Sequence, residues 1–367
     1  MTERELEILK IIKQNPMISQ NELAYALCIT RSGAAAHIHN LIKKGYIKGK
    51  GYVLSEPRFV TVVGGINIDI MGVSKSHLIR DNSNPGKIYN LLGGAGRNIS
   101  LTLTKLDVPN YFISVFGDDI NGDKFVEDSN EHNMDIQYCE RITGIATSSF
   151  LYIDDSDGSR IMGIDDMDIY QQMTPAFIEK NLERINHSEY CIIDTNLPKE
   201  TIDYICKKVT VPLIVKTVSM NKNHRFIHNL DKIKFLITSQ NELAQMVSEL
   251  KKPYTNLDTA ADTLLNQGLE NIIVFSMRKG LFYKSANTKY IFNTGQHIIV
   301  NPVGAGSTLT GALVWGLQKN IKLEDTLKYA YTAACMTMEE KESVNPFLSN
   351  DALFEKKQQY FQQGITF

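Results

Sequence analysis

From residue 59 onward, short apolar runs rich in β-branched residues alternate with amphipathic helical patterns. A run that is apolar at every position is typical of a strand in a parallel sheet, because helices cover both faces of such a sheet. The alternation therefore predicts an α/β fold with a mainly parallel sheet sandwiched by helices. The expected strands lie at 59–63, 111–115, 190–193, 212–215, 235–238 and 271–275, and the expected helices at 97–106, 175–185, 199–207, 241–250 and 257–267.

Two stretches interrupt this alternation, at 69–91 and 147–164. Each has the composition of strands without an intervening helix, and the second contains turn-forming residues at 154–158. Both stretches are predicted to form antiparallel strand pairs outside the main sheet. A small sheet of this kind can close over a ligand as a β lid.

The N-terminal segment has a different pattern. Apolar residues at helical spacing predict a first helix at 3–12, and the capping box at 19–22 starts a second. A third helix is expected from Thr30 to a C-terminal glycine at Gly45, followed by an alternating, glycine-bracketed hairpin at 46–54. Helix, helix-turn-helix and hairpin wing, in this order, predict a winged-helix head.

The head carries basic residues on its third helix and wing, with no acid among them. Such a surface can neutralise DNA phosphates, and a short side chain beside it allows close approach to the major groove. We therefore interpret residues 1–56 as a winged helix-turn-helix DNA-binding domain and residues 57–367 as a second domain. A three-helix interaction module with a solvated basic face is the alternative. The candidate DNA-binding residues are Arg31, Ser32, Lys43, Lys48 and Lys50, with Lys44 on the same helix.

Composition excludes several classes of protein. No apolar run approaches the ~20 residues that a membrane span needs, and the N-terminus lacks the apolar stretch of a signal peptide. Five scattered cysteines without a C-x-x-C motif indicate reduced thiols in a cytoplasmic protein. The eight histidines show no ligand spacing, so direct ligation of a metal by the protein is not expected. The net charge of −2 requires any nucleic-acid surface to be local.

Two glycine-rich segments of the large domain suggest a site for a sugar. The segment 64–69 (GGINID) follows the first strand, and the segment 93–98 (GGAGRN) precedes a helix. The vicinal hydroxyls of a ribose need a carboxylate acceptor, an amide, and backbone N–H groups that glycines leave exposed. The second segment taken alone is also compatible with a purely structural strand-to-helix turn.

These segments resemble the PfkB (ribokinase-like) family of carbohydrate and nucleoside kinases, and their motifs are most similar to the pseudouridine kinase form. The resemblance covers residues 59–350. It implies a ribokinase-like fold and a homodimer paired through the lids. It also implies that one aspartate grips the sugar hydroxyls while later residues flank the substrate. The substrate-binding candidates are Asn67, Asp69, Gly93, Gly94, Asn98, Asp166 and Asn196.

A second family signature, Gly-Ala-Gly-Asp, is altered in this chain. Gly304, Ala305 and Gly306 keep the glycine-rich anion hole, but Ser307 stands where the family has its catalytic aspartate. A serine hydroxyl is not a useful proton acceptor near neutral pH, so a general base that contributes ~10²–10⁴-fold is missing. Ser307 therefore marks the catalytic position and is predicted to be inactive as a base.

Further departures gather on the nucleotide side of the resemblance. The family's Asn-x-x-Glu appears as Ser239 to Glu242, the first glycine of the nucleotide loop ending at Gly280 is Met277, and Lys216 replaces an aspartate. A side chain in place of glycine would crowd the nucleotide phosphates. ATP and Mg²⁺ are thus expected as cofactors only if the enzyme is active. The segment 342–346 resembles the family's surroundings of a monovalent-cation site.

Retained sugar-facing motifs, a damaged nucleotide side and a DNA-binding head together favour a regulator. In this hypothesis a nucleoside or ribose-like ligand, similar to pseudouridine, changes the spacing of two winged helices in a dimer. The alternative is an active ATP-dependent pseudouridine, nucleoside or sugar kinase that uses another base, such as Asp194. A ligand-binding or scaffold role without DNA is the third possibility.

Overall fold

The computed structural model describes residues 1–48, 58–157, 160–295 and 298–362. The chain divides into two compact units, Met1–Arg58 and Phe59–Phe367, called here the head and the kinase-fold unit. Lys50 and most of the predicted wing lie outside the described residues, as does the end of the predicted turn at 154–158.

The head consists of three helices around a small apolar core that includes Ile8, Leu23 and Ile38. Thr2, Ser19 and Thr30 cap the helices, because each side-chain oxygen accepts a hydrogen bond from a backbone N–H of the first turn. The capping box predicted from the sequence at Ser19 is present. The helices are α1 (Glu3–Gln14), α2 (Gln20–Ala26) and α3 (Arg31–Lys43).

The main sheet of the kinase-fold unit has the strand order β14-β13-β12-β11-β10-β9-β1-β4. The six strands predicted from the sequence are the parallel ones, and an antiparallel hairpin that was not predicted, β13 (Gly280–Ser285) and β14 (Lys289–Phe292), extends one edge. The parallel strands are β1 (Val60–Val63), β4 (Asn110–Ile113), β9 (Cys191–Asp194), β10 (Leu213–Lys216), β11 (Ile233–Thr238) and β12 (Asn271–Ser276).

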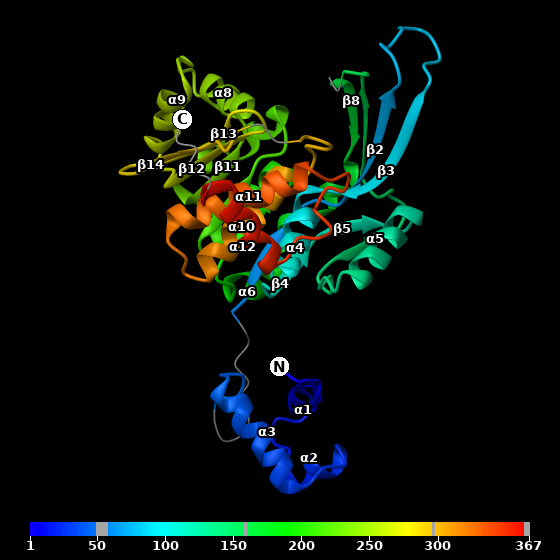
Figure 1. Cartoon of the computed structure of the whole chain (residues 1–367), viewed down its shortest axis with the longest axis vertical. Helices are drawn as coiled ribbons and strands as arrows, with labels where there is room; N and C mark the ends of the chain where they lie inside the picture. Colours follow the sequence, from blue (N-terminus) through cyan, green and yellow to red (C-terminus); the bar gives the residue numbers. More distant parts are fainter. Residues whose placement is uncertain (49–57, 158–159, 296–297, 363–367) are drawn as a thin grey trace. The chain divides into compact units, whose positions relative to one another are not determined.

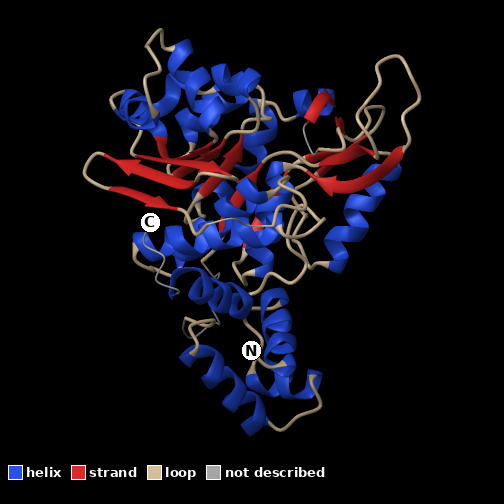
Figure 2. Cartoon of the chain, turned by 45° about the horizontal axis from the view of Figure 1, so that its top comes forward, coloured by secondary structure: helices blue, strands red, loops and turns tan. Residues whose placement is uncertain are grey.

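Successive residues of the buried strands supply two separate cores. Val62 and Ile192 enter the core on one face of the sheet, whereas Val63 and Ile193 enter the core on the other. Figure 2 shows the strands between the two helix layers. One layer contains α4 (Ala95–Lys105), α5 (Ile120–Glu131), α10 (Ala305–Gln318), α11 (Leu323–Met338) and α12 (Asn350–Gln362), and the other contains α6 (Pro175–Asn186), α7 (Lys199–Lys208), α8 (Gln240–Glu249) and α9 (Leu257–Leu265).

A second, four-stranded sheet with the order β3-β2-β7-β8 lies beside the main sheet, and we call it the lid sheet. Its strands β2 and β3, and β7 and β8, form the two antiparallel pairs expected from the sequence, while β2 and β7 join the pairs in parallel. Figure 1 shows these strands projecting away from the layers of helices. The strands are β2 (Asn67–Ser74), β3 (Gly86–Gly93), β7 (Ser149–Asp154) and β8 (Arg160–Asp166).

Shorter elements complete the unit. Strands β5 (Val115–Gly117) and β6 (Glu140–Ile142) form a two-stranded sheet. Three 3-10 helices, η1 (Asp168–Gln172), η2 (Met220–Arg225) and η3 (Ile227–Lys232), connect the larger elements. Across the part of the chain that the structure describes, no helix combines the length and apolar character required to cross a membrane.

Candidate functional site

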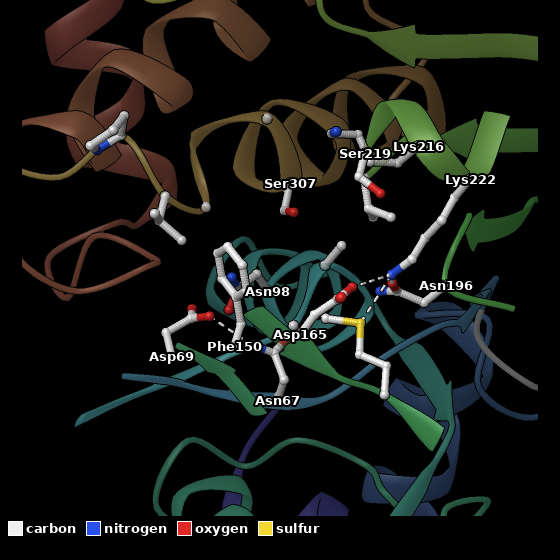
Figure 3. Close-up of a pocket in the computed structure, with 18 residues that line it drawn as sticks. Asn67, Asp69, Asn98, Phe150, Asp165, Asn196, Lys216, Ser219, Lys222 and Ser307 are labelled. Carbon is white, nitrogen blue, oxygen red and sulfur yellow. Dashed lines mark hydrogen bonds and ion pairs between the residues drawn. The ribbon is translucent and has the colours of Figure 1, made fainter. Parts of the chain in front are cut away.

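A cavity of about 330 Å³, the first cavity, opens between the lid sheet, the segments that follow β9 and β10, and the starts of α4 and α10. The carboxyl ends of parallel strands are where α/β sheets commonly bind ligands. Figure 3 shows its polar side chains converging from both the lid sheet and the main sheet. Of the residues predicted from the sequence, those that line it are Asn67, Asp69, Gly94, Asn98, Asn196, Gly304, Gly306 and Ser307.

The lid sheet presents a carboxylate and an amide to the first cavity. Asp69 is 4% exposed, and its Oδ1 accepts a hydrogen bond of 2.7 Å from Nδ2 of Asn67. Gly93 pairs across the sheet beside them, and a Cβ at this position would lie only 2.1 Å from Oδ2 of Asp69. The missing side chain of Gly93 thus makes room for the Asp69 carboxylate. Gly93 itself does not line the cavity.

Asp166, predicted to flank the substrate, does not line the first cavity, whereas its neighbour Asp165 does. Asp165 lines the first cavity together with Phe150, its register partner on β7. Successive side chains of a strand point to opposite faces, so Asp166 is directed away from the cavity and is exposed. Composition alone could not decide which of two adjacent aspartates on β8 faces inward.

Asp194 has a structural position rather than a place in the cavity. Its carboxylate is fully buried and accepts hydrogen bonds from the backbone N–H groups of Gly65 (2.8 Å), Gly96 (2.9 Å) and Asn196 (2.9 Å). Burial raises the pKa of the Asp194 carboxyl group, although these three donors oppose the shift. Because Asp194 does not line the first cavity, the alternative in which it serves as the catalytic base loses its geometric basis.

The amide of Asn98 is oriented by two donors. Its Oδ1 accepts hydrogen bonds from the guanidinium of Arg97 (3.0 Å) and from Oγ of Ser343 (3.1 Å), which leaves the NH₂ group to the cavity. Arg97 is in turn held by both carboxylate oxygens of Asp128, at 2.8 and 2.6 Å. The 342–346 segment, predicted near a monovalent-cation site, thus connects the starts of α4 and α10 through Ser343.

Sequence reasoning missed Lys222, which lies on η2 at the rim of the lid sheet. Its ammonium is 2.8 Å from Oδ1 of Asn196, 3.2 Å from Oδ2 of Asp165 and 3.0 Å from Sδ of Met167. Burial lowers the pKa of Lys222, and the Asp165 carboxylate opposes that shift. No sequence motif marked this lysine, because only the fold brings η2 to β8. The other lining residues that were not predicted include Phe150, Val218 and Ser219.

Helix α10 begins at the opposite wall of the first cavity. Its N-cap residue Gly304 has φ +89°, and a Cβ there would lie 1.8 Å from the backbone oxygen of Ser343, so only glycine fits. Ser307 lines the cavity and is 5% exposed, and its hydroxyl has no hydrogen-bond partner among the described residues. Ala305 is buried in the core and contributes only backbone.

A second cavity of about 440 Å³ shares Lys216, Pro302, Val303 and Gly306 with the first. The two cavities therefore meet at Lys216 and the start of α10. The side chain of Met277 lines the second cavity. Gly280 does not line it and instead begins β13 with φ +83°.

The residues of the second cavity do not fit a magnesium–nucleotide complex well. Mg²⁺ is usually held through carboxylates, and no described residue that lines this cavity is acidic. Glu242 directs its Oε2 into the protein, where it accepts hydrogen bonds from Ser239 N–H (2.8 Å) and Thr217 Oγ1 (2.8 Å). Ser239 and Glu242 form a capping box for α8, which explains their spacing without a metal.

The basic candidates of the head differ in their surroundings. Arg31 and Ser32 start α3, and these two residues, together with Lys43 and Lys48, are exposed. Lys44 instead pairs at 2.7 Å with Glu5, which is only 2% exposed. Lys44 is exposed as well, but its ion pair also stabilises the fold of the head. Over the described ranges, no group of three or more histidine, cysteine or acidic residues is placed to hold a metal ion.

Comparison with protein families accounts for both units. A model of the pfkB family of carbohydrate kinases matches residues 57–350. A model of winged helix-turn-helix DNA-binding domains matches residues 1–48. These matches agree with the family and the head predicted from the sequence.

Individual relatives cover nearly the whole chain or its kinase-fold unit. The uncharacterized sugar kinase YeiI of Escherichia coli is 31% identical over 353 residues, which span 96% of this chain and 98% of that protein. The pseudouridine kinase of the same organism is 24% identical over 298 residues, covering 81% of this chain and 95% of that protein.

Solved structures show the shared fold. The ribokinase of Arabidopsis thaliana, determined with ribose and ATP, superposes with a TM-score of 0.69 at 19% identity and covers 83% of this chain and 99% of that one. The ribokinase of Thermotoga maritima gives a TM-score of 0.70 at 18% identity, with 82% and 99% covered. The predicted ribokinase-like α/β fold is confirmed.

Proposed function

The chain belongs to the pfkB carbohydrate kinase family, and from this premise we propose that it is a DNA-binding regulator. In this proposal the first cavity of the kinase-fold unit binds a nucleoside or ribose-like ligand, the head binds DNA, and phosphate transfer is impaired. The chain is proposed to act in the cytoplasm, where both DNA and nucleosides are available.

The observation that carries the proposal is Ser307 at the start of α10. A kinase that phosphorylates a sugar hydroxyl gains from a base that removes the hydroxyl proton. The carboxylates that line the first cavity are those of Asp69 and Asp165, and both come from the lid sheet rather than from α10. The wall where phosphate would be transferred therefore presents a hydroxyl and the Lys216 ammonium instead of a base.

The ligand class follows from the chemistry of the first cavity. The Asp69 carboxylate and the NH₂ group of Asn98 match the acceptor and donor needs of vicinal hydroxyls. Beside them, Phe150 and Met167 provide apolar surface. A planar base attached to a ribose has both kinds of surface, which supports a nucleoside.

The head supports a DNA-binding role through the position of its charges. In helix-turn-helix proteins, the first residues of the recognition helix approach the base edges. Arg31 and Ser32 occupy these positions on α3, while Lys43 and Lys48 lie further along the chain and are exposed. Lysine and arginine at such sites bind phosphates and make the affinity dependent on salt.

A homodimer is part of the proposal, because the lid sheet has an exposed apolar face. Its register places Leu151 opposite Ile164 and Met162 opposite Ile153, on the face away from Asp69 and Asp165. Leu151 is 41% exposed and Ile164 is 65% exposed. Apolar side chains in such a patch mark surfaces that bind other proteins, and a second lid sheet would cover them.

The proposal is tested by measuring ATP turnover of the full chain with a panel of nucleosides and pentoses. We expect very slow turnover by the wild-type chain, because no base is positioned at Ser307. The Ser307→Asp variant restores a carboxylate there, and a positioned base is worth ~10²–10⁴-fold. Activity that appears only in this variant would support the loss of the base as the cause.

The matched control is Ser248→Asp, which adds the same charge at an exposed position on α8. It should leave turnover unchanged. Rapid turnover by the wild-type chain would contradict the proposal and would instead support an active nucleoside or sugar kinase that carries a DNA-binding head.

A further inference from the structure

The first cavity has walls of different charge. The Asp69 carboxylate belongs to the lid-sheet wall, and Asp165 on the same wall is paired with Lys222 at 3.2 Å. The opposite wall contains Ser307 and Lys216 beside the start of α10, and none of its lining residues is acidic. A ligand that fits both walls has hydroxyl groups at one end and negative charge at the other.

The start of α10 offers hydrogen-bond donors. The first N–H groups of an α-helix have no partner within the helix, and the helix dipole makes this end favourable for anions. Here Gly304 and Gly306 leave the backbone open to the cavity. The Ser307 hydroxyl is also free to donate a hydrogen bond, because no described residue is bonded to it. Its side chain is only 5% exposed.

Lys216 provides an independent indication of an anion. A Cβ on Gly306 would lie 2.8 Å from Cε and 3.4 Å from Nζ of Lys216, so the ammonium lies against the first turn of α10. A cation at the positive end of a helix is unfavourable unless an anion lies between them. The ammonium donates a hydrogen bond to the backbone oxygen of Thr217, which is uncharged.

The nearby carboxylates do not neutralise Lys216 directly. Glu242 and Asp194 act on its ammonium through space, while burial lowers its pKa. Both carboxylates are already hydrogen-bonded elsewhere, Glu242 to Ser239 and Thr217, and Asp194 to three backbone N–H groups. Among the described residues, the Lys216 ammonium therefore has carboxylates acting on it through space but no direct ion pair.

We propose that the ligand of the first cavity is a phosphate monoester, a phosphorylated nucleoside or pentose, whose phosphate lies between Lys216, Ser307 and the first N–H groups of α10. This inference rests on the proposed regulatory function of the same cavity and names the class of ligand. A phosphate monoester carries about −1.5 to −2 charges at pH 7 and three acceptor oxygens, which matches this set of donors. The sugar hydroxyls are then left to Asp69 and Asn98.

The test compares ligands that differ only in the phosphate. Dissociation constants of the full chain are measured by calorimetry for ribose and ribose 5-phosphate, for pseudouridine and pseudouridine 5′-phosphate, and for inorganic phosphate alone. We expect the phosphorylated member of at least one pair to bind about tenfold or more tightly, because its phosphate gains charge-assisted hydrogen bonds that the free member lacks. Inorganic phosphate should compete with that ligand.

Two variants assign the preference to the proposed residues. Lys216→Met keeps the unbranched stem beside Gly306 but removes the charge, so it should weaken the phosphorylated ligand about tenfold and leave the free one unchanged. Ser307→Ala removes one donor and should act in the same direction with a smaller effect. Lys207→Met, at an exposed lysine on α7, is the control and should change neither constant.

The outcomes separate this inference from the proposed function. Equal binding of both members of each pair, or no binding by any of them, would overturn the phosphate inference. The same holds if Lys216→Met weakens both members equally. Slow ATP turnover alongside such a result would leave the regulatory proposal standing. Rapid ATP turnover with a free nucleoside would instead overturn the regulatory proposal, whichever member binds more tightly.

Discussion

Gly304 is the residue on which the start of α10 most depends. Its φ of +89° lies in the left-handed region, and a Cβ would lie 1.8 Å from the backbone oxygen of Ser343. A side chain here has to move the backbone of the 342–346 segment, which also orients Asn98 through Ser343. The conformation of Gly304 therefore affects two parts of the first cavity. These are the start of α10, where the phosphate is proposed to bind, and Asn98, which is proposed to bind the sugar.

We predict that Gly304→Ala destabilises the fold and abolishes ligand binding. Gly144 has φ +83° with no atom within 4 Å of the position that a Cβ would occupy. Gly144→Ala therefore loses stability only through its unfavourable backbone conformation. That cost is ~1–2 kcal/mol. The free energy of unfolding, measured with denaturant, should fall clearly further for Gly304→Ala than for Gly144→Ala. Equal losses in the two variants would show that the contact with Ser343 relaxes.

At the scale of single residues, sequence reasoning found side chains that belong to motifs and missed those that the fold brings in. Asn67, Asp69 and Asn98, expected at the substrate because they lie in the glycine-rich segments, line the first cavity. Lys222 was missed, since only the packing of η2 against α7 and α8 places its side chain beside Asp165 of β8. Gly280 was assigned to the nucleotide site, but its conformation serves a hairpin turn.

At the scale of elements, helix α8 shows how a motif can have a structural reason. Ser239 accepts a hydrogen bond from the Glu242 N–H, and the Glu242 carboxylate accepts one from the Ser239 N–H. This reciprocal pair satisfies two donors that a helix leaves open at its start. The spacing that resembles a family motif thus also stabilises the first turn of α8.

We predict that Ser239→Ala lowers the free energy of unfolding by about 1 kcal/mol, the usual cost of removing an N-cap. Ligand binding in the first cavity should be unchanged, because Ser239 lines only the second cavity. Ser248→Ala, at an exposed position on the same helix, should cost much less. A loss of ligand affinity in Ser239→Ala would contradict the purely structural role.

The elements themselves were predictable to different degrees. The six parallel strands were found because both of their faces are buried, which makes their sequences continuously apolar. The edge strand β14 lacks this signal, since it alternates between exposed and half-buried residues. Its neighbour β13 was missed although its first four residues are buried. The lid strands were recognised as strands, but their order β3-β2-β7-β8 depends on the parallel pairing of β2 with β7, which no local pattern specifies.

At the scale of the whole molecule, the proposed function requires that ligand and DNA affect each other's binding. Coupling between two sites is typically ~1–3 kcal/mol, which corresponds to a roughly 5–150-fold change in affinity. We predict that a ligand of the first cavity changes the affinity of the full chain for a duplex taken from upstream of its own gene by a factor in this range. The measurement is a gel shift at several salt concentrations, with and without ligand.

The head variants provide the controls for this measurement. Arg31→Ala and Lys48→Ala should each weaken DNA binding, and loss of a phosphate contact should reduce the salt slope by about 1. Lys10→Ala, at an exposed residue of α1, should have little effect. DNA binding that is insensitive to salt, or unaffected by Arg31→Ala and Lys48→Ala, would count against the assigned surface.

The buried carboxylate of Asp194 affects how a bound ligand can change the structure around the first cavity. One side chain holds the turn after β1, the start of α4 and the turn after β9, so these three segments share a single anchor. A displacement of any one of them by a bound molecule changes hydrogen bonds that the other two also need. A ligand that displaces Asn196 is therefore expected to shift the turn after β1 and the start of α4 with it.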